Sequence, residues 1–364
     1  MKLKKKPTGS SPKNSKASTG RGLLTIDITD QNIKIAHVSG RSPEQLVLEN
    51  YKIFPIPQGY VQDGKINNEE QFIVVLQEAY SQFKGGSKQI VAALPHNVVT
   101  IQNFAYTPDS DTTLEDAANF EAAQIATIDE VDMDYQVVSS SADSEEVLMV
   151  IALKTDTRPY LDCLEESGFG KLKFLDIEPY AIVNAFSNWI NTQSPDLENQ
   201  VVAIFDIGSI KTQCLIVKAG KVLFRQEVLF GGEQLTREIQ RNYQVSQEEA
   251  EKIKVSAEQP VDYEEFTVAG YNQELALEIQ RVLQFFYTSA HSNGNDKISR
   301  LLLTGGTAVL PNLTKIVEET TNVPTLVINP MQYVGVASHI DPMSLIQDAG
   351  RLTVCCGLAV RGVA

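Results

Sequence analysis

The chain has 364 residues, 43% of them hydrophobic, and a formal net charge of −15. Because a single hydrophobic core stops growing at about 250 to 300 residues, a chain of this length has room for more than one core. Its acidic balance disfavours nucleic acid as a partner, and it has neither an apolar run of the roughly 18 residues that span a bilayer nor a signal peptide's apolar segment. We therefore expect a soluble, cytoplasmic protein of two or more lobes that binds no nucleic acid.

The first 21 residues differ in charge from the rest of the chain. They hold seven lysines and arginines and no acid, so the formal net charge of −15 becomes −22 once these seven positive charges are set aside. The segment is rich in Lys, Ser, Gly and Pro, which predicts a disordered basic tail over 1–21. It could be a solubilising leader, or it could contact an anionic membrane surface, which is worth about 1 kcal/mol per nearby basic residue.

The first half of the chain predicts alternating strands and helices. We expect a β-meander over 23–53, a helix over 69–83 and a strand over 89–94. Between 96 and 154 the order changes to strand 98–104, helix 112–126 and strands 134–140 and 145–152, which reads as a small α/β subdomain inserted into a first lobe, 22–199. The first lobe then continues with helix 156–167, strand 173–176, helix 179–192 and a hinge at 194–199.

A second lobe, 200–340, repeats this pattern. It is expected to contain a meander over 201–229, a helix over 234–243, a helix opening at Ser246, a helix over 272–289, a strand over 299–303 and a helix over 310–320. Ser246 and Glu249 form a capping box, which supports a helix start there. The last residues, 341–364, are expected to form a C-terminal helix that packs back on the first lobe.

The two lobes share one short sequence motif. Residues 24–28 and 203–212 each contain an apolar, strand-like run that leads to an acid, Asp27 or Asp206. Small or polar residues and a second strand follow each acid. Two such units suggest two related halves that face each other across a cleft. Carboxylates at the tips of such hairpins can hold a metal ion, while backbone N–H groups in the turns hold phosphates, so the layout points to a nucleotide.

The cysteines and histidines suggest no other chemistry. Cys163, Cys214, Cys355 and Cys356 show no paired spacing, so neither a zinc site nor a disulfide framework is predicted. The four histidines, His37, His96, His291 and His339, are scattered without metal-ligand or nucleophile spacing.

Several short segments, taken in order along the chain, resemble sequences of the PilM family, the cytoplasmic actin-like proteins of type IV pilus assembly. They are 120–124, 132–137, 175–180, 230–236, 248–254, 278–286 and 356–361, and the likeness runs from about residue 23 to residue 361. The resemblance implies an α/β, actin-like two-lobe fold, which is a duplicated ribonuclease H-like fold, with the inserted small α/β subdomain in the first lobe. It also implies binding of ATP or ADP with Mg²⁺.

The second acid-ended hairpin carries the expected metal and phosphate contacts. Asp206 would face a hydrated Mg²⁺, an ion that typically keeps several waters and takes one or two carboxylates. Gly208 lets the backbone approach a phosphate because it has no Cβ. The alternative is an ordinary hairpin with a solvated acid. The nearby residues that would also contact the nucleotide are Ser209, Lys211, Thr212 and Gly232.

The first hairpin departs from the family pattern. The glycine that usually follows Asp-Ile is replaced by Thr29, and Asp30 places an anion beside the expected γ-phosphate. Two charges at about 4 Å interact by roughly 4 kcal/mol at an effective dielectric of 20, so triphosphate binding should weaken unless a metal or Lys34 offsets it. By resemblance Asp27 keeps a metal contact and Thr29 and Lys34 lie at the cofactor. The alternative is a turn-forming acid in a degenerate site.

Two further segments resemble the nucleoside end of the family's site. Gly305, Gly306 and Thr307 follow a late strand, and adjacent glycines let a flat ring pass over the backbone, although a plain strand-to-helix turn would use glycines too. Glu251 and Lys254 share one helical face, which by resemblance meets the ribose and base. A solvated ion pair is the alternative reading of that face.

No residue is assigned to catalysis. Glu121 and Gln124 share a helical face, but their helix belongs to the inserted block, where a structural or partner-facing role is favoured. We therefore expect nucleotide binding with slow or absent turnover.

The resemblance implies an adaptor function. PilM-like proteins bind the N-terminal cytoplasmic peptide of a PilN-like inner-membrane protein, and so link it to the pilus motor ATPase or an inner-membrane platform protein. The peptide is expected near 94–104 and 120–128, where an extended apolar segment can dock by edge pairing. The protein would then be peripheral at the inner membrane through its partners, and self-association is left open.

Two alternatives share the same fold. An FtsA-like filament protein tethered to a membrane would predict a C-terminal amphipathic helix, which the ending 358–364 does not resemble. A small-molecule kinase would predict a clear catalytic base and a full first glycine loop, against which Thr29 and Asp30 argue.

Overall fold

The computed structural model describes residues 22–83, 87, 89–108, 112–141, 143–256, 258–289 and 297–363. The expected basic tail, 1–21, and His291 lie outside these residues. Within the described ranges no helix combines the length and the apolar character needed to cross a bilayer. The four cysteines have free, buried thiols.

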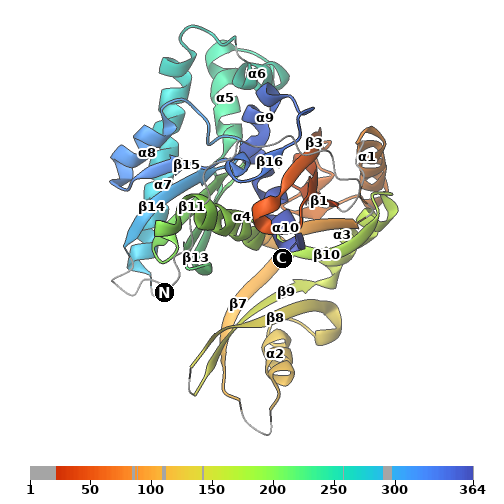
Figure 1. The fold of residues 1–364 in the computed structure, drawn as a ribbon. Helices are drawn as coiled ribbons and strands as arrows, with labels where there is room; N and C mark the ends of the chain where they lie inside the picture. Colours follow the sequence, from red (N-terminus) through yellow and green to blue (C-terminus); the bar gives the residue numbers. More distant parts are fainter. Residues whose placement is uncertain are drawn as a thin grey trace, which may run out of the picture.

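Two mixed sheets form the body of the molecule (Figure 1). The first has the order β10-β6-β1-β2-β3-β16 and consists of β1 (Gly22–Ile28), β2 (Asn32–Ser39), β3 (Val47–Pro55), β6 (Gln89–Leu94), β10 (Lys171–Ile177) and β16 (Gly335–Val336). The second has the order β13-β12-β11-β14-β15 and consists of β11 (Val201–Ile207), β12 (Thr212–Lys218), β13 (Lys221–Val228), β14 (Ile298–Thr304) and β15 (Thr325–Val327).

The two sheets have the same pairing pattern. In each, an antiparallel meander of three strands is followed by two strands parallel to its first strand: β6 and β10 extend from β1, and β14 and β15 extend from β11. The strands β1 and β11 are buried along nearly their whole length, as expected for central strands that are covered on both faces. The repeated sequence motif therefore forms the first strand of each meander, β1 or β11.

Helices cover the outer faces of both sheets and fill the space between them. On the first sheet lie α1 (Glu69–Gln82) and α3 (Lys154–Glu166); on the second lie α5 (Gly232–Tyr243), α6 (Gln247–Val255), α7 (Ala269–Thr288) and α8 (Leu313–Thr321). Between the sheets, α4 (Glu178–Gln193) packs against α10 (Thr353–Val363), and one hydrophobic cluster joins these helices to strands of both sheets. The short α9 (Pro342–Asp348) and the 3-10 helix η7 (Ala349–Leu352) precede α10.

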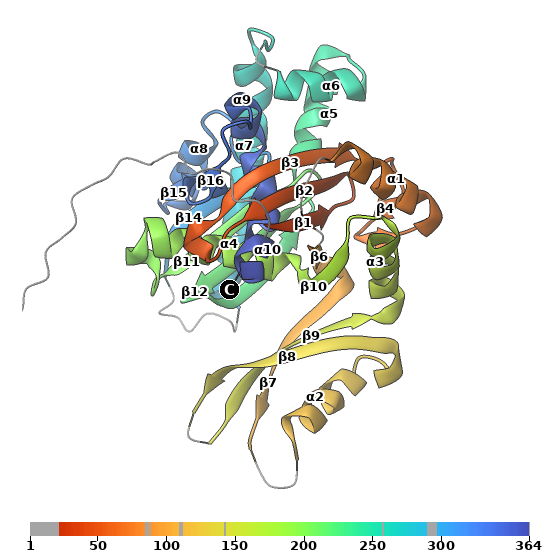
Figure 2. The same ribbon diagram turned by 45° about the vertical axis from the view of Figure 1, so that its right-hand side comes forward.

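A small α/β block projects from the first sheet (Figures 1 and 2). It contains β7 (Val99–Tyr106), α2 (Leu114–Ala123), β8 (Val131–Ser140) and β9 (Glu145–Leu153), in the sheet order β7-β9-β8. Its own small core is built from Ala118 and Ala122 of α2 against Val131, Met149 and Ile151. The hairpin of β4 (Val61–Gln62) and β5 (Lys65–Ile66) lies in the chain just before α1.

Most predicted elements are present, with shifted ends where a local signal overrides periodicity. Ser246 caps α6 through the expected capping box with Glu249. The helix predicted at 310–320 begins only at Leu313, because Asn312 takes a left-handed conformation with φ of 61°. The helix predicted from residue 272 begins at Ala269, directly after a π-helical turn, Glu264–Val268. The short β16 pairs with β3, so the chain returns to the first sheet before the expected boundary at residue 340.

Candidate functional site

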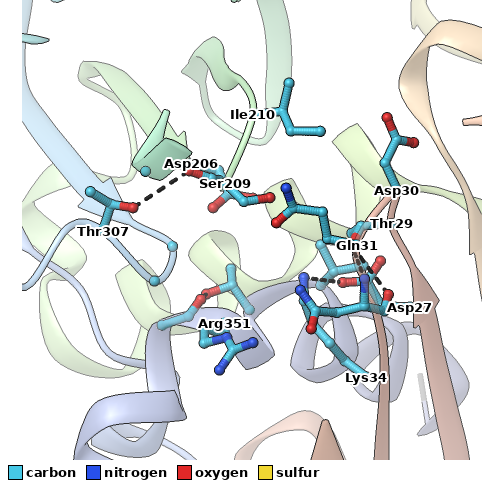
Figure 3. Close-up of a pocket in the computed structure, with 18 of the residues that line it drawn as sticks. Asp27, Thr29, Asp30, Gln31, Lys34, Asp206, Ser209, Ile210, Thr307 and Arg351 are labelled. Atoms are coloured by element: carbon cyan, nitrogen blue, oxygen red, sulfur yellow. Dashed lines mark hydrogen bonds and ion pairs between the residues drawn. The ribbon is translucent and has the colours of Figure 1, made fainter. Parts of the chain in front are cut away.

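The two acid-ended hairpins meet in one pocket of about 380 Å³ between the sheets. Asp27 at the end of β1 and Asp206 at the end of β11 line it from opposite sides (Figure 3). The predicted nucleotide and metal residues that line this pocket are Asp27, Thr29, Lys34, Asp206, Gly208, Ser209, Lys211, Gly232, Glu251, Lys254, Gly305, Gly306 and Thr307. Thr212 does not: it is 2% exposed and its hydroxyl donates to the Phe230 carbonyl at 2.6 Å. Thr212, which was predicted to contact the nucleotide, therefore lies outside the pocket lining.

Asp27 forms a buried ion pair within its own hairpin. Lys34 faces it across β1 and β2, with 2.8 Å between Nζ and Oδ2, and the two side chains are 15% and 4% exposed. Burial acts to lower the pKa of Lys34, but attraction by Asp27 and Asp206 outweighs it, so the pKa is raised. The ammonium stays charged and offsets part of the negative charge of the two acids.

The loop after β1 shows how the departures from the family pattern are accommodated. The Thr29 N–H donates to the Asn32 carbonyl at 2.9 Å, and the Thr29 hydroxyl also hydrogen-bonds the Asn32 backbone. Asp30 accepts the N–H groups of Asp63 and Gly64 at 3.0 and 2.9 Å. Figure 3 shows its carboxylate directed away from Asp27 and Asp206. Asp30 still lines the pocket, but the repulsion predicted from the sequence is reduced because the turn between β4 and β5 holds its carboxylate aside.

The second loop is held against the start of α5. The Gly208 N–H donates to the Lys211 carbonyl at 2.9 Å, and the N–H groups of Gly232 and Glu233 donate to the carbonyls of Gly208 and Ser209 at 2.9 and 2.7 Å. These bonds use N–H groups at the first turn of the helix, which would otherwise lack partners. Ser209 and Gly208 are thereby fixed at the pocket wall beside Asp206.

The glycine turn after β14 is packed tightly against the second acid. Gly305 has φ of 93°, and a Cβ at this position would lie 2.6 Å from an Asp206 carboxylate oxygen. The following Thr307 is oriented toward the same loop, with its hydroxyl 3.5 Å from the Gly208 carbonyl. Only glycine fits at 305, because both the backbone conformation and the space exclude a side chain.

A compact polar cluster forms the edge of the pocket next to α5 and α6. Lys254 Nζ lies 2.7 Å from a carboxylate oxygen of Glu251 and 2.7 Å from the hydroxyl of Thr236, which itself donates to Glu251 at 2.5 Å. Lys254 also donates to the Gly232 carbonyl at 3.3 Å. The predicted ion pair is therefore part of a network that ties α6 to α5 at the pocket wall.

Glu178, Gln213 and Arg351 are among the pocket residues to which the sequence gave no site role. Glu178 begins α4 directly after β10, so it lies at the carboxyl end of a parallel strand, where ligand sites are common in α/β sheets. Gln213 stands opposite Asp206 in the register of β11 and β12. Arg351 comes from η7 and points into the pocket in Figure 3, with Asp348 2.9 Å from its guanidinium. Only the position of Glu178 after a strand could have been noticed in the sequence.

The pocket carries more negative than positive groups. Its carboxylates are Asp27, Asp30, Glu178, Asp206, Glu251 and Asp348, and its cations are Lys34, Lys211, Lys254 and Arg351. Each of these four cations already has a carboxylate within 2.7 to 2.9 Å. A polyphosphate would therefore meet an acidic pocket, and a bound divalent cation would offset the repulsion.

Two of these acids bind protons more tightly than usual. Burial raises the pKa of Glu178 to about 7, and the charge of Asp27 adds to the effect. Burial likewise raises the pKa of Asp206 to about 6, while Lys34 opposes the shift. Among the described residues no group of three His, Cys, Asp or Glu side chains is placed to hold a metal ion. The donor set fits Mg²⁺, which needs only one or two carboxylates beside water and phosphate oxygens.

The raised pKa of Glu178 predicts a pH-dependent stability. Its pKa is near 7 in the folded state, against an ordinary value of 4.5. Between these two values the folded state binds more protons than the unfolded state, so the free energy of unfolding falls as the pH rises toward 7. We expect this residue to make the free energy of unfolding about 2 kcal/mol lower at pH 8 than at pH 5.5. Urea unfolding with EDTA should show that Glu178→Gln removes this part of the pH dependence, whereas Glu274→Gln on the exposed face of α7 does not. Equal pH dependence in wild type and Glu178→Gln would contradict it.

Glu121 and Gln124 lie away from the pocket. Both are on or next to α2 in the projecting block, where the Gln124 amide donates to the Glu121 carboxylate at 3.2 Å. Neither lines the pocket, so the structure gives them no part in orienting a water there.

Comparison with known proteins agrees with this geometry. The model of a family described as type IV pilus assembly protein PilM matches residues 25–363. Cell division protein FtsA of Bacillus subtilis is 25% identical over 224 residues, a match that covers 56% of this chain and 49% of FtsA, so the chain spans about half the length of that relative. A PilM-PilN type IV pilus biogenesis complex is similar in structure, with a TM-score of 0.76 at 21% identity over 94% of this chain and 98% of that chain.

A nucleotide-bound protein is among the similar structures. MreB 5 of Spiroplasma citri bound to AMPPNP has a TM-score of 0.50 at 14% identity, over 94% of this chain and 95% of that chain. These likenesses confirm the predicted actin-like fold. The family match extends over nearly all of the described residues and includes both lobes, the projecting block and α10. The chain therefore belongs to the PilM family of type IV pilus assembly proteins.

Proposed function

We propose that this chain is a cytoplasmic adaptor of pilus assembly that binds Mg²⁺ with ATP or ADP and holds the N-terminal cytoplasmic peptide of a PilN-like inner-membrane protein. Through that peptide it would be peripheral at the inner membrane, and it would link the membrane protein to the pilus motor ATPase or a platform protein. The observation that carries the nucleotide half is that Asp27 and Asp206 line one pocket.

The residues around this pocket suit a metal-bound nucleotide. Asp206 lacks an ion-pair partner within 4 Å among the described residues, so its carboxylate is free to face a hydrated ion, whereas Asp27 is held by Lys34. When bound, Mg²⁺ would supply the positive charge that the paired lysines cannot. Gly208 and Ser209 would contact phosphates, and Gly305 and Gly306 would leave room for the nucleoside.

The projecting block offers a surface for an extended peptide. The strand β7 is an edge strand of its sheet, so its outer backbone groups can pair with an added strand. Next to it in the expected region, Phe120 is 69% exposed, and Ile125 and Ile128 are also exposed. An apolar peptide that covers these side chains would remove them from water, which is the main source of affinity in such contacts. The similar PilM-PilN complex supports a PilN-like peptide as the partner.

Two contacts connect this block to the second sheet. Arg225 of β13 donates to the Ile101 carbonyl of β7 at 3.1 Å, and Lys221 pairs with Glu146 of β9 at 3.3 Å. Glu227 of β13 also pairs at 2.8 Å with Lys211, a pocket residue in the loop before β12. A change of lobe position on nucleotide binding would thus be transmitted to the peptide surface.

Calorimetry tests both halves of the proposal. A PilN-type N-terminal peptide should bind the wild-type protein, and Phe120→Ala should weaken this binding about tenfold or more because it removes a large exposed contact. Phe266→Ala is the matched control, since Phe266 is 70% exposed on the other lobe and should leave the affinity unchanged. ATP and ADP should bind with Mg²⁺ and much more weakly with EDTA. Absence of peptide binding would refute the adaptor role, and absence of Mg²⁺-nucleotide binding would refute the nucleotide site.

An FtsA-like filament is the second candidate, favoured by the 25% identity to FtsA over 56% of this chain. ATP-dependent sedimentation of the full chain would support it. A protein that stays monomeric with ATP and Mg²⁺ would exclude it.

A further inference from the structure

Gln213 is a buried polar residue for which the fold provides no hydrogen bond. It lies in β12 and is 5% exposed, and both its amide oxygen and its amide nitrogen are buried without a partner among the described residues. Buried polar groups are nearly always satisfied, because an unpaired one loses its hydrogen bonds to water and gains nothing in return. An amide with two unsatisfied ends therefore indicates a missing partner.

The position of Gln213 shows where that partner would be. The register pairs Gln213 directly with Asp206 across β11 and β12, and opposed residues in antiparallel strands have neighbouring side chains on one face. Both residues line the pocket between the sheets. The next residue, Cys214, points the other way into the core of the second lobe, as strand alternation requires.

The neighbouring residues do not hydrogen-bond the amide in this structure. On the adjacent strand β13, the facing Glu227 is engaged by Lys211 at 2.8 Å. Thr212, one residue earlier, uses its hydroxyl on the Phe230 carbonyl. Asp206 can only accept hydrogen bonds while it is ionised, so it cannot donate to the amide oxygen.

We propose that Gln213 is a ligand-positioning residue of the nucleotide site, and that it holds the hydrated Mg²⁺ and a terminal phosphate oxygen beside Asp206. Its amide oxygen accepts from a metal-bound water, and its amide nitrogen donates to a phosphate oxygen, so one side chain matches both kinds of group. The ligand class is a nucleoside di- or triphosphate carrying Mg²⁺. This inference rests on the proposed function and adds the residue that links metal and phosphate.

A purely structural role predicts the opposite pattern of effects. If Gln213 supported the fold, an apolar replacement would destabilise the free protein and leave ligand binding alone. If it serves the ligand, replacing an unpaired buried amide by an apolar side chain of similar shape leaves the free protein equally stable or more stable. The two roles therefore differ in the sign of the stability change and in the affinity.

The test compares Gln213→Met with Gln226→Met in the full chain. Gln226 is a suitable control because it lies one strand away on β13, its amide oxygen is also buried without a partner among the described residues, and it does not line the pocket. Urea unfolding in EDTA without nucleotide should give Gln213→Met a midpoint equal to or above that of wild type. Calorimetry should show its affinity for ATP and ADP with Mg²⁺ reduced about 10- to 100-fold, a range typical for lost outer partners of a metal.

Gln226→Met should bind Mg²⁺-nucleotide as wild type does. A lower unfolding midpoint with unchanged Mg²⁺-nucleotide affinity would overturn the inference while leaving the proposed function intact. Failure of the wild-type protein to bind Mg²⁺-nucleotide would instead refute the proposed function itself.

Discussion

Replacing Gly357 with alanine will lower the free energy of unfolding by about 3 kcal/mol, because the change forces apart two helices packed backbone to backbone. Gly357 lies in α10 where it crosses α4, and a Cβ built there would overlap the Ala181 carbonyl. The crossing lies between the two sheets, next to the cluster that joins them, so neither helix can move without disturbing both lobes. Urea unfolding of the two proteins in EDTA measures the effect.

The control for this substitution is Gly270→Ala. Gly270 is exposed near the start of α7, and a Cβ there would meet no atom within 4 Å. Alanine should therefore raise stability by about 0.5 to 1 kcal/mol through its better helix propensity. Equal stability changes at the two positions would show that α10 does not pack against α4 as described.

The two related acids will respond differently to the same substitution. We expect Asp27→Asn to lower the free energy of unfolding by about 3 kcal/mol, because it removes the ion-pair partner of the partly buried Lys34 ammonium. Asp206→Asn should not lower it, since burial raises the pKa of Asp206 to about 6 and its carboxylate has no ion-pair partner within 4 Å among the described residues. Urea unfolding at pH 7.5 in EDTA compares the three proteins.

Nucleotide affinity should show the complementary result. Asp206→Asn should weaken binding of ATP with Mg²⁺ by about 100-fold, because the neutral amide no longer attracts the hydrated ion. Binding by Asp206→Asn as tight as that of wild type would place the metal elsewhere. A stable Asp27→Asn protein would mean that the pair with Lys34 is replaceable by solvent.

The asymmetry between these acids arises from their cross-strand neighbours. The residue opposite Asp27 is Lys34, and the residue opposite Asp206 is Gln213. Both pairs follow from the same hairpin geometry, so one duplicated frame holds one acid in an ion pair and leaves the other available to a ligand. The sequence shows both hairpins, but the partner of each acid depends on the register.

Local sequence signals account for most of the fold. The apolar runs of β1 and β11, each ending on an acid, predicted the duplicated frame, and the capping box at Ser246 marked the start of α6. The change of pattern after residue 96 predicted the block that contains β7, α2, β8 and β9. These features could be predicted because periodicity, capping and turn chemistry act between residues close in the chain.

The site depends on contacts between distant residues. Asp30 was expected to face a phosphate, but two N–H groups of the loop between β4 and β5 hold its carboxylate aside, some 33 residues along the chain. Arg351 enters the pocket only because α10 packs between the sheets and brings η7 with it. Neither contact can be predicted from a local sequence pattern.

The sequence by itself therefore determined the two acid-ended halves, the inserted block and the family of this protein. Each of these features depends on residues that are close together in the chain or on the order of short sequence motifs. Only the tertiary structure decided which acid is neutralised, where Asp30 points, and that Glu178, Gln213 and Arg351 share the pocket. The physical reason is that charge pairing and hydrogen-bond satisfaction depend on distance in space, and in this fold the groups concerned come from strands and helices far apart in the chain.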